Sequence, residues 1–421
     1  MLIQFNFSNY KSFRDDNSLD MSATKISEHN DRVVSIANDR LLRVAAIYGA
    51  NASGKSNVHD AFRFMSIYIL DSFEYGGKRK KRYQHAHPFK LDKNSEKEKS
   101  TFEVFFIDKS DPSMKSYQYG FSLIGVTVVE EWLNYKSKSG REYKSIFYRN
   151  TETDQLDFDK IPERQAEKLI SSLRPETLIV SFAEILRIPL LKIVYRWVLR
   201  NDAIDFSSDY ESLFRLSKLP ENFVDDIEVQ NKVVQFFNSF DESIIGFDIR
   251  KVPTEEGDDE ENSGYIIYAK HRMIDSNDIA LIPLQDESKG TLEMFSIFPS
   301  MQEVLKSGSV LFIDELNTKL HPLLVRNIIL TFANPAINIS NAQLIFTSHD
   351  TWQLSNNLLR RDEIWFTDKD YNGVTSLYSL ADFVDEEGVK IRKDESYEKN
   401  YLLGKYGAIP SLKSIDFLIG E

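Results

Sequence analysis

The segment that most constrains this chain is residues 49–56, GANASGKS, which join the apolar run 41–48 (LLRVAAIY) to a helical pattern over 57–70. It matches the pattern G-x-x-x-x-G-K-S, in which glycines let backbone N–H groups face phosphate oxygens at the start of a helix. At these places Lys55 would reach the β and γ phosphates, and the Ser56 hydroxyl would coordinate Mg²⁺. A strand, a glycine-containing loop and a helix in this order predict an α/β fold with a phosphate-binding loop.

A chance match is the alternative, because a glycine-containing loop meets this pattern in roughly one or two chains per hundred of this length. The place of the loop between an apolar run and a helix argues against chance and favours nucleotide binding. The residues predicted to surround the phosphates are Gly49, Ala50, Asn51, Ala52, Ser53, Gly54, Lys55, Ser56 and Asn57.

A second segment, VLFIDE at 310–315, has four apolar residues followed by two carboxylates. A buried parallel strand would bring Asp314 to the carboxyl edge of the sheet, where it can hold Mg²⁺ through water. Glu315 would then polarise an attacking water as general base. Taken alone, such a strand end is more often simply solvated, but together with the phosphate-binding loop it predicts a hydrolytic site.

Two further segments carry candidate residues in less specific patterns. QLIFTSHD at 343–350 is another buried strand, and its His349 can hydrogen-bond a γ-phosphate and couple it to a conformational change. The alternative is a polar cap on the strand. ESKGT at 287–291 precedes a helix, so Ser288 and Gly290 can bind phosphate at the helix N-terminus. The alternative there is an ordinary helix cap.

Composition excludes several classes of protein. Acidic residues outnumber basic ones by 65 to 52, and the net charge of −13 argues against a generally basic nucleic-acid binder. The chain has no cysteine, which excludes disulfides, thiol catalysis, zinc–cysteine sites and iron–sulfur clusters. No stretch predicts a membrane span, and the N-terminus alternates like a strand rather than a signal peptide. We expect a soluble, cytoplasmic protein with no membrane partner.

The order of patterns predicts three segments. Residues 1–148 form an N-terminal lobe with the phosphate-binding loop and antiparallel strands, 149–268 a mainly helical insertion, and 269–421 a C-terminal lobe with the carboxylates and the histidine. The basic loop 76–82 and the acidic loop 255–261 are predicted to be exposed connections. Strands are predicted at 2–7, 101–108, 117–135, 310–313, 343–347 and 364–367, and helices at 163–173, 183–200, 228–240, 290–305 and 322–332.

Together, these motifs and their order resemble the ABC-type ATPases, in the branch of SMC, RecF and OLD-like heads. They comprise a Walker A loop, a long insertion, a signature at 288–291, a Walker B strand and a switch histidine. Both ends of the chain also resemble the stand-alone ABC-type AAA ATPases of prokaryotic phage-defence loci, such as the PARIS ATPase. The segments that carry this resemblance are FSNYKSF at 7–13, DEIWFTDKD at 362–370, SLYSLADF at 376–383 and YLLGKYGAIP at 401–410.

The resemblance implies a P-loop NTPase of ABC type, with a mixed sheet, an antiparallel N-terminal β-subdomain and an inserted helical subdomain. It implies an ATPase that converts ATP to ADP and phosphate, with ATP and Mg²⁺ as cofactors. Catalysis would depend on Lys55, Glu315 and His349, and the metal ligands would be Ser56 and Asp314.

The resemblance also implies assembly. In such heads two subunits hold two ATP molecules between them, so a chain with one Walker A loop would form a homodimer or a larger homo-oligomer. Ser288 and Gly290 would act in trans on the γ-phosphate, and Asn317 of the D-loop would carry signals between the two sites. Three departures stand out. The signature is Ser-Lys-Gly-Thr, Asn317 stands where the family often has Asp, and the Q-loop glutamine is replaced in its expected segment, 179–184, by Glu184.

The predicted function is that of an ATP-binding and hydrolysing sensor or switch in antiviral defence. It would control a separately encoded toxic effector, expected to be a nuclease, because the residues after 367 are too few for a TOPRIM domain and the insertion has no clear nuclease constellation. The trigger would be nucleic acid or a phage protein. The alternative is a DNA-repair or DNA-clamp ATPase of RecF or SMC type, which would bind duplex DNA through patches such as 78–82. A scaffold without turnover is disfavoured, because the catalytic positions are filled, whereas slow turnover is compatible with them.

Overall fold

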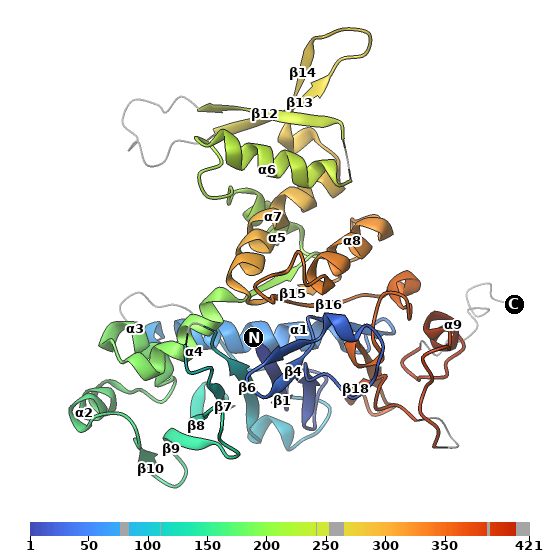
Figure 1. The fold of residues 1–421 in the computed structure, drawn as a ribbon. Helices are drawn as coiled ribbons and strands as arrows, with labels where there is room; N and C mark the ends of the chain where they lie inside the picture. Colours follow the sequence, from blue (N-terminus) through green and yellow to red (C-terminus); the bar gives the residue numbers. More distant parts are fainter. Residues whose placement is uncertain (76–83, 110, 241, 252–264, 385–387, 410–421) are drawn as a thin grey trace, which may run out of the picture. The chain divides into compact units, whose positions relative to one another are not determined.

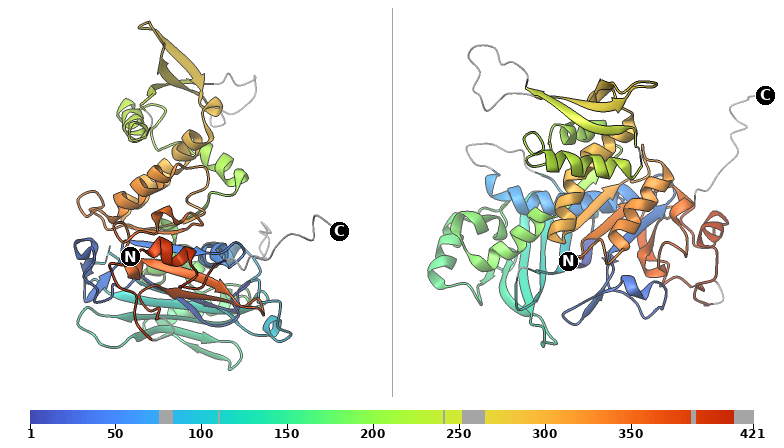
Figure 2. Two further views of the ribbon diagram at one scale, coloured as in Figure 1. Left: turned by 90° about the vertical axis from the view of Figure 1, so that its right-hand side faces the viewer. Right: turned by 45° about the horizontal axis from the view of Figure 1, so that its top comes forward.

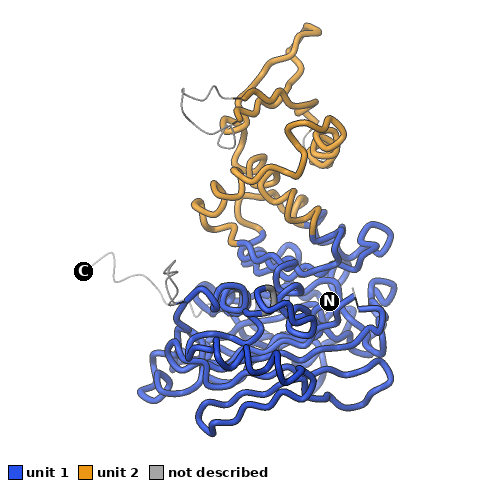
Figure 3. Tube along the Cα trace, turned by 90° about the vertical axis from the view of Figure 1, so that its left-hand side faces the viewer, with its two compact units in different colours: residues 1–204, 304–316, 326–421 blue, residues 205–303, 317–325 orange. Residues whose placement is uncertain are grey.

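The structure is a computed structural model that describes residues 1–75, 84–109, 111–240, 242–251, 265–384 and 388–409. Two compact units make up the chain (Figure 3). Unit 1 comprises Met1–Ile204, Val304–Leu316 and Arg326–Glu421, and unit 2 comprises Asp205–Glu303 and Asn317–Val325. The three lobes expected from the sequence are a different division and stay a prediction. The basic loop 76–82 and the acidic loop 255–261 lie outside the described residues.

Unit 1 contains a seven-stranded antiparallel sheet (Figure 1). In spatial order its strands are β10 (Gln155–Asp157), β9 (Lys144–Asn150), β8 (Thr127–Lys136), β7 (Ser116–Ile124), β6 (Ser100–Ile107), β1 (Leu2–Ser8) and β2 (Asn17–Asp20). The single strand expected at 117–135 is wrong. That run is a hairpin of β7 and β8, because Gly125 takes φ 63° and turns the chain between them.

A six-stranded sheet carries the three motifs that lie in this unit. In spatial order its strands are β11 (Asp202–Asp205), β15 (Val310–Asp314), β16 (Gln343–Thr347), β5 (Val44–Gly49), β17 (Ile364–Lys369) and β18 (Thr375–Ser379). From β15 to β17 the strands are parallel, and β18 is antiparallel to β17. Strands β5, β15 and β16 are buried along their whole length, which explains their continuous apolar runs. Their carboxyl ends, Gly49, Asp314 and Thr347, therefore meet at one edge of the sheet.

Helix α1 (Lys55–Asp71) packs between these two sheets, which form separate layers of unit 1 (Figure 2). On one side, the rings of Phe64 and Tyr68 contact Phe102 and Phe121 of the antiparallel sheet. On the other side, Phe62 contacts Phe312 on β15. A single hydrophobic cluster thus joins both sheets through α1. The predicted mixed α/β fold with a parallel core sheet and an antiparallel N-terminal sheet is confirmed.

The helix predicted over 183–200 is two helices. After α2 (Glu163–Ser172), α3 (Ala183–Leu186) ends where Arg187 adopts the left-handed conformation with φ 53°. Ile188 is extended, as the residue before a proline prefers, and α4 (Pro189–Arg200) starts with that proline. Unit 1 also contains two small strands, β3 (Val34–Ile36) and β4 (Asp39–Leu41), and the helix α9 (Tyr397–Leu402).

Unit 2 contains α5 (Asp209–Leu216), α6 (Ile227–Asn238) and a three-stranded antiparallel sheet that the sequence did not lead us to expect. The sheet consists of β12 (Ile244–Lys251), β13 (Tyr265–Arg272) and β14 (Ile279–Pro283). Phe237 on α6 and Phe247 on β12 contact Phe295 on α7 (Lys289–Ser307), so these three elements share one core. Between the Walker B strand and β16, α8 (Pro322–Ala333) spans the predicted helix 322–332.

Candidate functional site

The loop 49–56 needs both of its glycines for steric reasons. A Cβ on Gly49 would lie 2.5 Å from Oγ of Ser53 and 2.5 Å from Oγ1 of Thr367, closer than such atoms approach. Gly54 begins α1 at φ 112°, where a side chain is strained, and a Cβ there would lie 2.7 Å from Cγ2 of Thr375. The loop is therefore packed tightly against β17 and β18.

Hydroxyl groups from the far end of the chain support this loop, and we did not predict them. Ser53 Oγ lies 2.6 Å from Oγ1 of Thr367, the fourth residue of β17. Thr375 Oγ1, on β18, donates to the carbonyl oxygen of Ser53 at 2.9 Å and lies 2.8 Å from Oγ of Ser12. The Asn57 amide donates to that same Ser12 oxygen at 2.8 Å. The neighbouring strands thus fix the loop from outside the motif.

Lys55 is buried and directed to the loop's own backbone. Its Nζ donates to the carbonyl oxygens of Gly49 and Ala50 at 3.0 and 3.1 Å. Burial lowers the pKa of Lys55, whereas the carboxylates of Glu315 and Asp314 act in the opposite direction. The ammonium group is therefore held at the mouth of the loop, the place from which a P-loop lysine reaches phosphate.

Asp314 and Ser56 offer the oxygen ligands that a hard cation prefers. Asp314 is 4% exposed and accepts hydrogen bonds from the hydroxyls of Ser56 and Thr347, the latter at 2.5 Å. Burial raises the pKa of Asp314. Among the described residues no group of three or more His, Cys, Asp and Glu side chains is placed to hold a metal ion. One carboxylate and one hydroxyl suit Mg²⁺, which keeps several waters and binds phosphate oxygens as well.

Glu315 and His349 form the polar pair of the site. Nδ1 of His349 lies 2.7 Å from Oε2 of Glu315, and the two side chains are 55% and 19% exposed. Glu315 adopts φ 56° at the end of β15, and its backbone N–H donates to Oγ1 of Thr347 at 2.8 Å. The structure thus brings the predicted Asp314, Glu315 and His349 together. Thr347 lies in a segment that we singled out, but we gave it no role there.

The signature residues belong to unit 2. Ser288 accepts a hydrogen bond from the backbone N–H of Thr291 at 3.1 Å, so in this structure it acts as the helix cap that we named as the alternative. Gly290 lies close to the D-loop, since a Cβ there would be 3.2 Å from the carbonyl oxygen of Lys319. Asn317 belongs to the same unit. The functional roles of Ser288, Gly290 and Asn317 stay predictions.

A buried charge cluster fixes the signature helix to its neighbours in unit 2. Glu293 on α7 is 2% exposed, and its Oε1 pairs with Nη2 of Arg215 on α5 at 2.6 Å. Its Oε2 accepts from Ser212 at 2.8 Å and lies 3.6 Å from Nζ of Lys319, which in turn binds Asp209 at 2.9 Å. The D-loop, α5 and the start of α7 are therefore linked by a network of paired charges.

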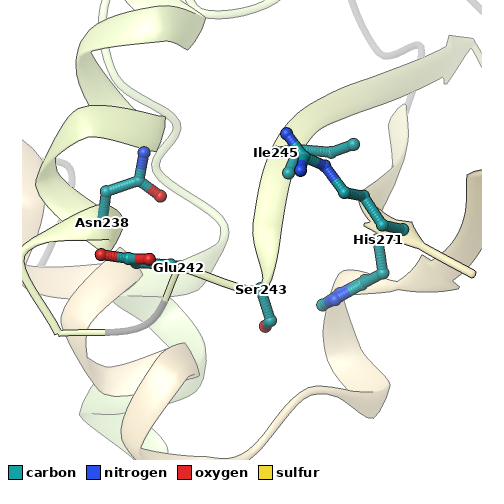
Figure 4. A pocket seen from close by; sticks show the side chains of 6 residues that line it. Asn238, Glu242, Ser243, Ile245 and His271 are labelled. Atoms are coloured by element: carbon teal, nitrogen blue, oxygen red, sulfur yellow. The ribbon is translucent and has the colours of Figure 1, made fainter. Parts of the chain in front are cut away.

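Two pockets lie near residues of the candidate site, one in unit 2 and one in unit 1. In unit 2, a pocket of about 360 Å³ is lined by Asn238, Glu242, Ser243, Ile245, His271 and Arg272 (Figure 4). Nε2 of His271 lies 2.8 Å from Oε1 of Glu287, the residue before the signature. In unit 1, a pocket of about 580 Å³ lies beside the start of α1. It is lined by Lys11, Ser12, Asn57, His87, Pro88, Phe89, Lys90, Leu91, Lys369 and Gly373.

These features define the class of the protein. A buried strand, a phosphate-binding loop and a helix that places lysine and serine beside a strand-end aspartate are the hallmarks of P-loop NTPases. The family model AAA_21, described as "AAA domain, putative AbiEii toxin, Type IV TA system", matches residues 44–351. The chain therefore belongs to this family of P-loop ATPases, which generally bind ATP with Mg²⁺.

Two SMC head domains are among the solved structures that match this chain. The SMC head domain from Thermotoga maritima is 13% identical with a TM-score of 0.40, and the match covers 90% of this chain and 98% of that one. An Smc head domain from Pyrococcus furiosus, with an extended coiled coil and bound to the C-terminal domain of ScpA, is 12% identical with a TM-score of 0.35. That match covers 96% and 98% of the two chains. No curated protein matches the sequence.

Two remaining expectations concern the membrane and the Q-loop. Within the described ranges, every helix is too short or too polar to cross a membrane.

The expected Q-loop segment 179–184 lies in a short helical stretch, but the side chain of Glu184 is outside what the structure describes. The backbone N–H groups of Ile179 and Val180 donate to the buried carboxylate of Glu131 at 2.8 and 3.2 Å.

Proposed function

We propose that this chain is a Mg²⁺-dependent ATPase that acts as a sensor or switch in antiviral defence. The observation that carries the proposal is the pairing of His349 Nδ1 with Glu315 Oε2 at 2.7 Å, next to Asp314 and the P-loop lysine. A nucleotide-binding site without hydrolysis needs the loop and the lysine, but it has no need of an oriented carboxylate beyond the metal ligand. The proposal therefore includes turnover as well as binding.

Each residue has a definite part in the proposed reaction. The loop amides and Lys55 bind the phosphates, and Ser56 and Asp314 hold Mg²⁺, which neutralises charge on the β and γ phosphates. Glu315 accepts a proton from the attacking water as general base. With Glu315 ionised, Nδ1–H of His349 donates to Oε2 and fixes the direction of the carboxylate.

The pocket beside Asn57 supports a place for the rest of the nucleotide. Pro88, Phe89 and Leu91 provide an apolar wall that suits a base, and Lys90 and Lys369 place positive charge beside that wall. Its volume of about 580 Å³ falls within the range typical of small-molecule sites. We infer that base and ribose bind there, close to the Ser12–Asn57 hydrogen bond that supports the P-loop.

The proposed active form is a homodimer or a larger homo-oligomer. The chain has one P-loop, and its signature residues, Ser288 and Gly290, belong to the other compact unit, fixed to the D-loop by the charge cluster around Glu293. In the proposed complex, the signature and Asn317 of one chain meet the nucleotide of its partner. ATP binding then closes the assembly, and hydrolysis, which can be slow, reopens it.

The defence role rests on family membership and on the terminal segments that resemble phage-defence ATPases. The family description includes a toxin of a type IV toxin–antitoxin system. We propose that the closed assembly controls a separately encoded toxic effector, and that this effector is a nuclease. Nucleic acid or a phage protein acts as the trigger. The protein is proposed to work in the cytoplasm.

Mass photometry together with phosphate release tests this proposal. Wild type and Glu315→Gln are measured with and without Mg-ATP, and Lys55→Ala serves as the non-binding control. Glutamine keeps the shape of the side chain but cannot act as the base, so hydrolysis should fall by roughly 10²-fold or more while the ATP-bound oligomer accumulates. Hydrolysis at the wild-type rate by Glu315→Gln would exclude Glu315 as the base. A wild type that neither binds nor hydrolyses ATP would exclude the function itself.

A further inference from the structure

His59 is a buried histidine to which the proposed mechanism assigns no part. The side chain is 1% exposed, and neither ring nitrogen makes a hydrogen bond with any residue that the structure describes. Oδ1 of Asp60 lies 3.8 Å from Nδ1, beyond hydrogen-bond distance, and Asp60 itself pairs with Lys11. A buried polar group without a partner lowers stability, and an apolar residue of similar size would avoid that cost. Such a group in a well-packed helix points to a function.

The position of His59 relates it to the metal ligands. On α1 it lies three residues after Ser56, one helical turn further along the same face. Its ring packs edge-to-face on Phe312 of β15, with centroids 5.1 Å apart and planes at 87°. Phe312 and Asp314 are two residues apart on a strand, so their side chains leave the sheet on the same side. His59 therefore lies one turn of α1 beyond Ser56, against the side of β15 from which the Asp314 side chain projects.

The donors of Asp314 leave a place for one more partner. Asp314 accepts from Thr347 at 2.5 Å and from the hydroxyl of Ser56. An ionised carboxylate offers about four lone-pair positions, so these two hydroxyl donors leave room for a third donor. Burial raises the pKa of Asp314 and the nearby imidazole of His59 opposes that rise, so the ring is close enough to act on this carboxylate electrostatically.

We propose that His59 is a positioning residue for the Mg²⁺ site: it donates a ring N–H toward Asp314 when Mg²⁺ and nucleotide bind. The inference rests on the proposed ATPase function. Groups that orient a metal-binding carboxylate raise metal affinity without touching the metal. The buried imidazole thus lowers the stability of the empty protein, and the new hydrogen bond offsets this loss when Mg²⁺ and nucleotide bind.

The test is a Mg²⁺ titration of the binding of a fluorescent ATP analogue, with the full-length protein. His59→Leu removes the donor and should raise the Mg²⁺ concentration at half-saturation by between about five- and ten-fold. His59→Gln keeps an N–H donor and should restore it to within about two-fold of wild type. Met65→Leu, a fully buried apolar change on the same helix, is the matched control and should leave the Mg²⁺ dependence unchanged.

Thermal unfolding provides a second readout that does not depend on the loaded site. Without Mg²⁺ and nucleotide, His59→Leu should unfold at the wild-type temperature or above it, because it removes an unpartnered polar group. With both ligands present, it should gain less thermal stability than wild type. An unchanged Mg²⁺ dependence in His59→Leu, no rescue by His59→Gln, or a Leu variant that fails to fold would each overturn the inference. If wild type itself does not bind Mg-nucleotide, the proposed function fails first.

Discussion

Oγ1 of Thr347 lies 2.5 Å from Oδ1 of Asp314, where two neighbouring parallel strands end. The same oxygen accepts the backbone N–H of Glu315 at 2.8 Å. One hydroxyl thus orients the proposed metal ligand through its side chain and the proposed base through its backbone. Because Glu315 adopts the left-handed conformation, a backbone hydrogen bond at this residue helps to hold a geometry that costs free energy.

Thr347→Val should therefore impair turnover more than binding. Valine has nearly the same shape, but it neither donates to Asp314 nor accepts from Glu315. We expect turnover to fall by roughly ten-fold or more, since small displacements of catalytic groups are costly, and ATP affinity to change by less than about three-fold. The loss of two buried hydrogen bonds should also lower the free energy of unfolding by about 1–3 kcal/mol.

Phosphate release at saturating ATP and chemical denaturation provide the two readouts. Thr331→Val is a suitable control, because that hydroxyl bonds only the carbonyl of its own helix, at Asn327. If Thr347→Val loses stability as expected but keeps wild-type turnover, Thr347 contributes to folding and not to the reaction.

Lys55→Ala should abolish nucleotide binding. The variant loses the charge that reaches the phosphates and leaves the carbonyls of Gly49 and Ala50 without this donor. Charge-assisted hydrogen bonds of this kind are expected to be worth roughly 100-fold in ATP affinity. Isothermal titration with Mg-ATP measures the change. The matched control is Lys160→Ala, which removes the charge of an exposed lysine that follows β10. Unchanged affinity in Lys55→Ala would remove the basis for the phosphate-loop assignment.

The parts of the site that the sequence predicted are those in which one short segment carries both the strand and the chemistry. Residues 310–315 and 343–350 combine a fully buried run with polar residues at its end, so their meeting at one sheet edge follows from parallel pairing. Thr367 and Thr375 escaped prediction because their hydrogen bonds to Ser53 span 314 and 322 positions along the chain. Nothing local in their sequence marks them as supports of a loop.

The elements of the fold that could be predicted are likewise those that a local sequence pattern identifies. Buried parallel strands and α1 follow from apolar runs and from the P-loop pattern. The break at Arg187 depends on a left-handed residue that is not glycine, although Pro189 is a local signal for a new helix start. The sheet of unit 2 was missed because exposed apolar residues such as Ile266 and Ile279 obscure the alternation that identifies a half-buried strand.

His349→Ala should lower turnover and leave binding largely intact. Without Nδ1 at 2.7 Å from Oε2, the Glu315 carboxylate loses the contact that fixes its direction. We expect kcat to fall by between about 10- and 100-fold, with KM for ATP within about two-fold of wild type. Steady-state kinetics separates these two effects. His85→Ala, at an exposed histidine, controls for the general removal of an imidazole. A selective loss of ATP affinity in His349→Ala would contradict the proposed role.

The buried carboxyl of Glu131 should make folding stability depend on pH. This side chain is 0% exposed and accepts from the Tyr119 hydroxyl at 3.0 Å and from two backbone N–H groups. Burial raises the pKa of Glu131 from 4.5 to about 7, despite the opposing effect of Arg149. A carboxyl with a raised folded-state pKa contributes stability that is fully present below pH 4.5 and is lost as the pH rises through 7, because the unfolded chain ionises more readily.

Comparison with Glu131→Gln isolates this effect. Glutamine cannot ionise, and its amide group faces a backbone donor, so it should destabilise the protein by an amount that does not vary with pH. Between pH 5 and 8, we expect the free energy of unfolding of wild type to fall relative to Glu131→Gln, by on the order of 2–3 kcal/mol. Glu363, whose pKa burial raises to about 8, contributes equally to both proteins and cancels in the difference. Urea denaturation across this pH range measures the difference, and parallel curves for the two proteins would mean that Glu131 is already ionised in the folded state at pH 5.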